Sequence, residues 1–152
     1  MASASPQGQG VSAPPAGKHE AALEAAVALP GEDFSRVALT GPAVGLLQKL
    51  WETHGPLMFH QSGGCCDGSS PMCYPAGEFL TADADVLLGT FDLPERGSLD
   101  FWMSREQFAY WKHTHLTVDV VDGRGSGFSV EAPEGKRFLI RSRLFDGPAP
   151  AD

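Results

Sequence analysis

The chain has 152 residues and a formal net charge of −8, with an isoelectric point near 5.0. This acidic balance argues against nucleic-acid binding, because phosphate contacts need clustered Lys and Arg, and against an anionic membrane surface. No apolar run approaches the roughly 20 residues of a membrane-spanning helix. We therefore expect a cytoplasmic protein, and the length predicts a single folded domain.

Small and polar residues dominate both ends of the chain. Residues 1–32 contain mainly Ala, Gly, Ser, Pro and Gln, with few large apolar side chains. Such a segment buries too little apolar surface to offset the entropy lost on ordering. We predict a disordered tail over residues 1–32, a folded domain over 33–145 and a flexible tail over 146–152. Ala and Glu within residues 18–29 also permit a short helix there.

The first helix is predicted over residues 40–53. Thr40 is a suitable N-cap, and Pro42 falls in the first turn, where a missing N–H leaves no hydrogen bond unmade. Gly55 ends the helix and Pro56 prevents its continuation. Apolar residues recur along one face of this segment, so we expect that face to pack on the core.

Short strands and turns follow this helix. Ser104 with Gln107 three residues later forms a capping-box pattern, which predicts a short second helix over residues 105–111. Alternating or continuous apolar runs predict the strands. They span residues 57–61, 85–91, 99–103, 115–121, 128–130 and 137–145. The expected fold class is α+β, mostly β, with one N-terminal helix and one short second helix. The aromatic side chains, Trp102 among them, are expected in the core.

All three cysteines lie in one loop, which also contains glycines, serines and a proline. They are Cys65, Cys66 and Cys73. An odd number of cysteines crowded into nine positions is not a disulfide framework, and cytoplasmic thiols stay reduced. The loop is therefore predicted to bind metal or to be redox-active.

A metal site is the first hypothesis, because soft thiolates select zinc, iron–sulfur species or Cu(I). Cys65 and Cys66 are adjacent, and neighbours rarely both reach one tetrahedral ion without strain. His113 and His115 are two residues apart and would share a face if a strand already runs there. The candidate metal ligands are thus Cys65, Cys66, Cys73, His113 and His115. No catalytic residue is predicted.

Two alternatives remain open for these residues. In the first, Cys65 and Cys73 form a transient disulfide, and Arg141 and Arg143 lower a thiol pKa if the last strand lies near the loop. In the second, the cysteines are small buried hydrophobic residues, and the arginines are the solvated face of an edge strand. The histidines would then be solvent-facing or capping residues.

Several short segments, in this order, resemble motifs of the A-type iron–sulfur carrier (HesB/IscA-like) family. They are Leu39-Thr40, Ser62-Gly63-Gly64-Cys65, Thr114-His115-Leu116-Thr117-Val118-Asp119 and Gly127-Phe128-Ser129-Val130-Glu131-Ala132-Pro133. The resemblance implies a HesB-like small mixed sheet, a homodimer, and a ligand role for Cys65. The Cys-x-Cys near the end of the carriers is absent, and Ile140-Arg141-Ser142-Arg143-Leu144-Phe145 stands in its place.

A closer resemblance is to a small bacterial family of unknown function. It is carried by Met58-Phe59-His60-Gln61 and the cysteine loop through Cys73, by Gly127-Phe128-Ser129, and by Arg141-Ser142-Arg143-Leu144-Phe145. Members are often encoded beside aldehyde dehydrogenases. The resemblance implies an aldehyde dehydrogenase as partner and an accessory role in aldehyde or alcohol oxidation, but no chemistry. A metal ion or iron–sulfur cluster as cofactor is the expectation from the cysteine loop and the carrier-like segments.

Overall fold

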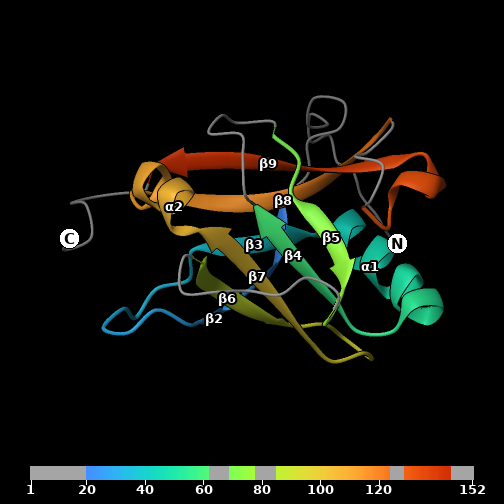
Figure 1. Ribbon diagram of the computed structural model, residues 1–152, viewed down its shortest axis with the longest axis horizontal. Helices are drawn as coiled ribbons and strands as arrows, with labels where there is room; N and C mark the ends of the chain where they lie inside the picture. Colours follow the sequence, from blue (N-terminus) through green and yellow to red (C-terminus); the bar gives the residue numbers. More distant parts are fainter. Residues whose placement is uncertain (1–19, 62–68, 78–84, 124–128, 145–152) are drawn as a thin grey trace, which may run out of the picture.

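Two β-sheets and two α-helices make up the described part of the chain. The computed structural model describes residues 20–61, 69–77, 85–123 and 129–144. Figure 1 shows the two helices at opposite ends of the long axis, with the sheets stacked between them. The predicted mixed fold, with mostly strands and two helices, is confirmed.

The four-stranded sheet has the order β1-β3-β8-β9, and its only parallel pair among the described strands is β3 with β8. Its strands are β1 (Ala21–Glu24), β3 (Val37–Thr40), β8 (Thr114–Asp122) and β9 (Lys136–Leu144). The five-stranded sheet has the order β2-β6-β7-β4-β5. Its strands are β2 (Ala26–Val27), β6 (Asp85–Asp92), β7 (Ser98–Ser104), β4 (Leu57–Gln61) and β5 (Met72–Pro75).

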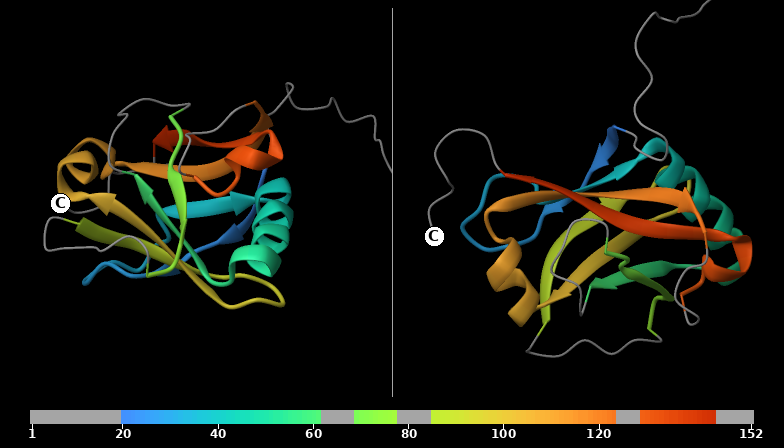
Figure 2. Two further views of the ribbon diagram at one scale, coloured as in Figure 1. Left: turned by 45° about the vertical axis from the view of Figure 1, so that its right-hand side comes forward. Right: turned by 90° about the horizontal axis from the view of Figure 1, so that it is seen from above.

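The hydrophobic core fills the space between the two sheets. On β8 the alternating residues Leu116 and Val118 are buried in it, as the sequence pattern predicted. On the opposing sheets Phe59 and Phe138 meet edge to face, with ring centroids 5.0 Å apart. Such pairs add about 1 kcal/mol to the stabilisation from burial alone. The core therefore joins β4 to β9 across the two layers (Figure 2).

Helix α1 (Gly41–His54) begins and ends where the sequence predicted. The Thr40 side chain accepts a hydrogen bond from the Ala43 N–H at 3.2 Å, and Pro42 lies in the first turn. Gly55 ends the helix with a φ of 77°, a backbone conformation that favours glycine. Helix α2 (Arg105–Trp111) likewise begins at the predicted cap, because Ser104 accepts from the Gln107 N–H. These local signals position both helices.

The prediction of a tail over residues 1–32 is wrong for residues 21–27, which form β1 and β2. The chain crosses from one sheet to the other at Ala25, whose N–H donates to the Val37 carbonyl at 2.9 Å. Ala25 is buried close against the backbone of Gly89 on β6. A Cβ at Gly89 would stand only 2.7 Å from the Ala25 Cβ, so the close approach requires glycine there. Small residues order here because pairing with β3 and β6 supplies backbone hydrogen bonds that composition alone does not reveal.

The two sheets are joined a second time, where β9 and the turn before the 3-10 helix meet β5 and the residues just before it. The Ile140 N–H on β9 donates to the Ser69 carbonyl at 2.7 Å, just before β5, and the Val130 N–H donates to the Cys73 carbonyl at 3.0 Å. Ser129 and Val130 were predicted to lie in a strand, but they form a turn before the short 3-10 helix η2 (Ala132–Glu134). Pro133 in that helix prevents a strand from continuing.

None of the helices in the described ranges is long and apolar enough to cross a membrane.

Candidate functional site

The structure places only part of the predicted ligand set. Cys65 and Cys66 lie outside the described residues. Cys73 is on β5, opposite Phe59, and its side chain is fully buried in the core. His113 lies in the turn before β8, and His115 is the second residue of that strand.

His115 and Cys73 lie on different sides of the four-stranded sheet. Leu116 faces the core, so the preceding His115 faces outward, where its Nε2 lies 2.9 Å from a carboxylate oxygen of Glu24 on β1. Cys73 lies opposite Phe59, which packs on Phe138, and Phe138 pairs with Val120 on β8. His115 is five residues from Val120 along that strand. At about 3.3 Å per residue this is roughly 17 Å of strand. The structure therefore does not bring His115 together with Cys73.

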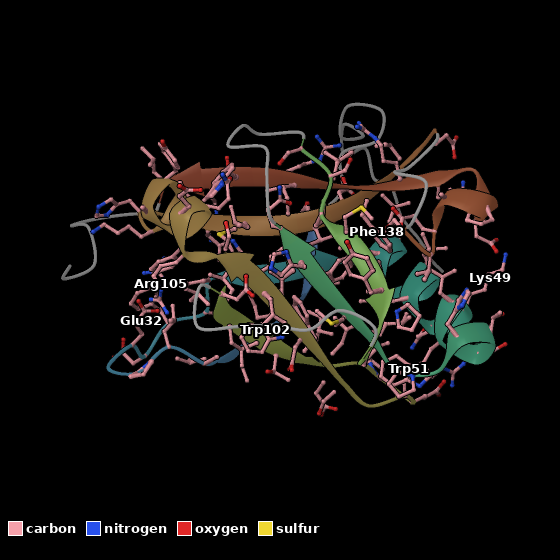
Figure 3. The ribbon with its side chains drawn as sticks, in the orientation of Figure 1. Glu32, Lys49, Trp51, Trp102, Arg105 and Phe138 are labelled. Atoms are coloured by element: carbon pink, nitrogen blue, oxygen red, sulfur yellow. The ribbon has the colours of Figure 1, made fainter. Side chains whose placement is uncertain are left out.

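The backbone of Cys73 is bound on both sides by the turn before η2. Its N–H donates to the Ser129 hydroxyl oxygen at 2.9 Å, and its carbonyl accepts from the Val130 N–H. The Ser129 hydroxyl in turn donates to Glu131 Oε1. Ser129 thus connects the β5 backbone to a carboxylate, and all three residues are buried. Figure 3 shows Phe138, the core neighbour of this region, beside β5.

Glu131 is the exceptional residue of this region. It is 0 % exposed, and its second oxygen, Oε2, accepts no hydrogen bond from the described residues. Within those residues no Lys, Arg or His forms an ion pair with it either. A buried carboxylate without a cationic partner is unfavourable, because transfer of the charge out of water is not compensated. Such a group needs an explanation beyond packing.

The thiol and the carboxylate are both held toward their neutral forms. Burial raises the pKa of the Cys73 thiol well above its usual value, and the charge of Glu131 raises it further. Burial also raises the pKa of Glu131, although hydrogen bonds from Ser129 and from backbone N–H groups act in the opposite direction. For Cys73, the predicted lowering of a thiol pKa is therefore wrong. Arg141 does not compensate for burial there, since its Nε binds Asp119 at 2.9 Å.

Ser69 is a further residue of this region, and it binds the edge of β9 that does not pair with β8. The Phe138 N–H hydrogen-bonds the Glu131 carboxylate, and the Ile140 N–H donates to the Ser69 carbonyl. Alternate N–H groups of a strand point to the same side, so Glu131 and Ser69 lie next to each other along this edge, roughly 7 Å apart. The Ser69 hydroxyl oxygen is also buried without a hydrogen-bond partner among the described residues. We call Ser69, Cys73, Ser129 and Glu131 the thiol–carboxylate cluster.

The cluster supplies one thiol and one carboxylate, which is fewer ligands than a metal ion needs. Within the described ranges, no three His, Cys, Asp or Glu side chains lie close enough together to hold a metal ion. Thiolate and carboxylate are nevertheless ligand types that Zn²⁺ accepts together. The cluster can therefore provide part of a metal site, and further ligands must come from elsewhere in the chain.

Sequence reasoning missed Ser129 and Glu131 as site residues. Both lie in the segment that resembles the carrier family, where the sequence predicts a strand that includes Ser129 and ends before Glu131. The available signal was Glu131 between Val130 and Ala132, a charged residue within an apolar run. Glu131 and Cys73 are 58 positions apart in the sequence, so their closeness depends on contacts between distant parts of the chain.

A family model described as a domain of unknown function (DUF779) matches residues 46–144 of the chain. This match covers more than half of the 152 residues, from within α1 through the cysteine loop to the end of β9. No curated protein and no solved structure matches the chain.

Proposed function

The chain belongs to the DUF779 family, and we propose that it is an accessory protein that binds a metal ion through its cysteine loop and the thiol–carboxylate cluster. The observation that carries the proposal is the buried pair of Cys73 and Glu131, with Glu131 Oε2 lacking a hydrogen-bond donor among the described residues. A metal ion would supply the missing positive charge, and it would make the deprotonated thiol favourable in a buried position.

Covalent geometry supports Cys65 and Cys66 as the additional ligands. Cys66 precedes Ser69 by only three residues, so their Cα atoms are at most about 11 Å apart, whatever the conformation of the loop. Ser69 lies beside Glu131 on the edge of β9. The proposed ligand set is therefore Cys73, Glu131 and one or both of Cys65 and Cys66. In this set Glu131 is the non-cysteine ligand, in place of His113 and His115, which the sequence predicted for that role.

The carboxylate favours a single ion over an iron–sulfur cluster. Iron–sulfur clusters are held by thiolates, with histidine as the usual replacement, whereas Zn²⁺ takes mixed sulfur and oxygen ligands. We therefore propose a divalent ion of the Zn²⁺ type. Because binding displaces the proton of Cys73, whose pKa is raised by burial, metal affinity is expected to increase with pH.

Elemental analysis of the purified full-length chain tests this proposal. We expect about one equivalent of metal, lost in Cys73→Ala and strongly reduced in Glu131→Gln, which keeps the size of the side chain but removes its charge. Glu134→Gln is the matched control, since Glu134 lies three residues later and binds Lys49 on the surface. Metal-free protein whose thermal stability does not change on adding chelator or Zn²⁺ would contradict the proposal.

The same preparation distinguishes an iron–sulfur species and the redox alternative. An iron–sulfur cluster would show visible absorption together with iron and sulfide in the analysis, and it would overturn the single-ion proposal. A redox thiol pair would contain no metal and would react rapidly with alkylating agents near neutral pH. The raised pKa of Cys73 argues against its participation in such a pair, because the thiolate is the reactive form.

The accessory role in aldehyde or alcohol oxidation stays a prediction that follows from the family resemblance, and the cytoplasmic location stays a prediction from composition. Purification of the full chain from its native host, followed by assay for dehydrogenase activity, tests it. Activity that co-purifies with the wild type but not with the Cys65→Ser, Cys66→Ser, Cys73→Ser variant would tie the partnership to the metal site. Activity retained by that variant would favour a partnership in which the cysteines only pack.

A further inference from the structure

A cavity lies on the outer face of the five-stranded sheet, away from the thiol–carboxylate cluster. Its volume is about 270 Å³, slightly below the range of about 300–1,000 Å³ that is typical of drug-sized ligands. Leu99 and Phe101 on β7 face the core, so the alternating residues Ser98, Asp100 and Trp102 face outward into this cavity. Met58 on β4, which pairs with Asp100, forms the adjacent wall.

The only charged side chain among the described residues that line the cavity is Asp100. Its Oδ1 accepts a hydrogen bond from the Thr90 hydroxyl on β6 at 2.8 Å, which fixes the direction of the carboxylate. No Lys, Arg or His within the described ranges forms an ion pair with it. The cavity therefore presents one oriented negative charge whose second oxygen has no partner among the described residues.

Trp102 and Met58 surround this carboxylate with polarisable, apolar surface. Trp102 was expected in the core, but it is partly exposed and lines the cavity instead; Figure 3 shows it beside β7. The face of an indole ring attracts cations, and a thioether packs well on alkyl groups. A carboxylate two residues from a Trp on the same face of a strand is thus complementary to an ammonium group that carries a short apolar part.

We propose that this cavity binds a small organic cation, with its ammonium group between Asp100 and Trp102 and its alkyl part against Met58. The carboxylate supplies charge and a hydrogen-bond acceptor, and the indole ring supplies attraction for the cation. This site is independent of the metal proposal, because it lies on the opposite face of the five-stranded sheet from Cys73.

Titration of the full chain with n-butylammonium, followed by NMR of the Trp indole N–H groups, tests the proposal. The chain has three Trp residues, and Trp102→Phe identifies the signal of Trp102. We expect saturable shifts of the Trp102 signal with n-butylammonium and none with butyrate, which has the opposite charge. Neutral 1-butanol should bind roughly fivefold more weakly than the ammonium ion, because it loses the charge term.

Two variants with the same change in net charge make the result specific. Asp100→Asn keeps an oxygen for the Thr90 bond and should weaken n-butylammonium binding roughly fivefold. Asp92→Asn removes an exposed carboxylate at the end of β6, outside the cavity, and should leave binding unchanged. Equal affinity for n-butylammonium and 1-butanol, or equal weakening by the two variants, would overturn the proposal. So would the absence of any shift at Trp102.

Discussion

Asp119 and Glu131, two carboxylates within the described part of the chain, are both completely buried, and their surroundings differ. Asp119 on β8 accepts hydrogen bonds from the Thr40 hydroxyl at 3.1 Å and from Arg141 Nε at 2.9 Å, so its charge is balanced and its oxygens are occupied. Glu131 accepts from Ser129, but within the described residues it forms no ion pair and its Oε2 has no donor. Burial is the same for both, and only the partners differ.

The comparison separates a structural carboxylate from a candidate functional one. Asp119 connects β3, α1 and β9, because Thr40 caps the helix and Arg141 lies on the edge strand. Its hydrogen bonds satisfy its charge and need no ligand. Glu131 is held next to a buried thiol, and no described residue balances its charge, an arrangement that lowers stability and that the proposed ligand would explain. Opposite responses to mutation are therefore expected at the two positions.

The largest effect is expected from Asp119→Ala. This change removes the buried carboxylate from the Arg141 guanidinium, which is only 23 % exposed, and removes an acceptor from Thr40. Breaking a buried ion pair in this way should lower the free energy of unfolding by about 3 kcal/mol, measured by urea denaturation. Asp122→Ala, which removes an exposed carboxylate of the same strand, is the control. A loss no larger than that of the control would show that Asp119 is not structural.

Ser129→Ala is expected to destabilise by about 2 kcal/mol. The hydroxyl accepts from the Cys73 N–H and donates to Glu131, so its removal leaves the buried Cys73 N–H without this acceptor and takes one hydrogen bond from the buried carboxylate. Chemical denaturation of the metal-free protein measures the loss. Ser129→Thr, which retains the hydroxyl, should recover part of it, and equal losses in the two variants would contradict the role given to that hydroxyl.

Thr40→Ala, the corresponding change beside Asp119, should cost about 1 kcal/mol. It removes the cap of α1 and one of several hydrogen bonds to the Asp119 carboxylate, which still binds Arg141 in this variant. Thr40→Ser should be nearly neutral. A loss in Thr40→Ala larger than that in Ser129→Ala would reverse the expected ranking of the two sites.

The smallest effect, with the opposite sign, is expected from Glu131→Gln. The pKa of Glu131 is raised from 4.5, so the unfolded chain releases this proton at lower pH than the folded chain does. The stability that protonated Glu131 contributes is therefore present below pH 4.5 and is lost as pH rises through the folded-state pKa. Glu131→Gln should abolish this loss and stabilise the metal-free protein by up to about 1 kcal/mol at pH 7.

Urea denaturation at several pH values, with metal removed, checks this result. The wild type and Glu131→Gln should be closest in stability at the lowest pH and diverge as the pH rises. An identical pH dependence in the two proteins would mean that Glu131 is not the group responsible. Added Zn²⁺ should reverse the order at pH 7, because only the wild type keeps all of the proposed ligands.

Local signals in the sequence predicted the elements well. Thr40, Ser104 and Gly55 act through hydrogen bonds and backbone angles within a few residues, so the bounds of α1 and α2 follow from short segments. The alternation in β8 similarly identified the residues that face the core. These features need no knowledge of the rest of the chain.

Features that depend on distant contacts were missed. Residues 21–27 are mostly Ala, with Leu23 and Val27 as the larger apolar side chains, and they order because they pair with β3 and β6. Glu131 and Cys73 meet only when the turn before η2 closes against β5. The two histidines were grouped by their spacing, but the fold turns His115 outward to Glu24. The sequence therefore singled out the loop that contains Cys73 but not Ser129 and Glu131, which only the fold brings to it.

The crossing at Ala25 has a consequence for how the protein is handled. A shortened chain beginning at residue 33, the start of the domain predicted from sequence, would lack β1 and β2 and leave the backbone edges of β3 and β6 unpaired. Unpaired edges are templates for joining to other chains. The short alanine-rich segment thus covers two strand edges that could otherwise pair with neighbouring molecules. Preparations that omit it should aggregate, so metal and ligand binding should be measured on the full chain.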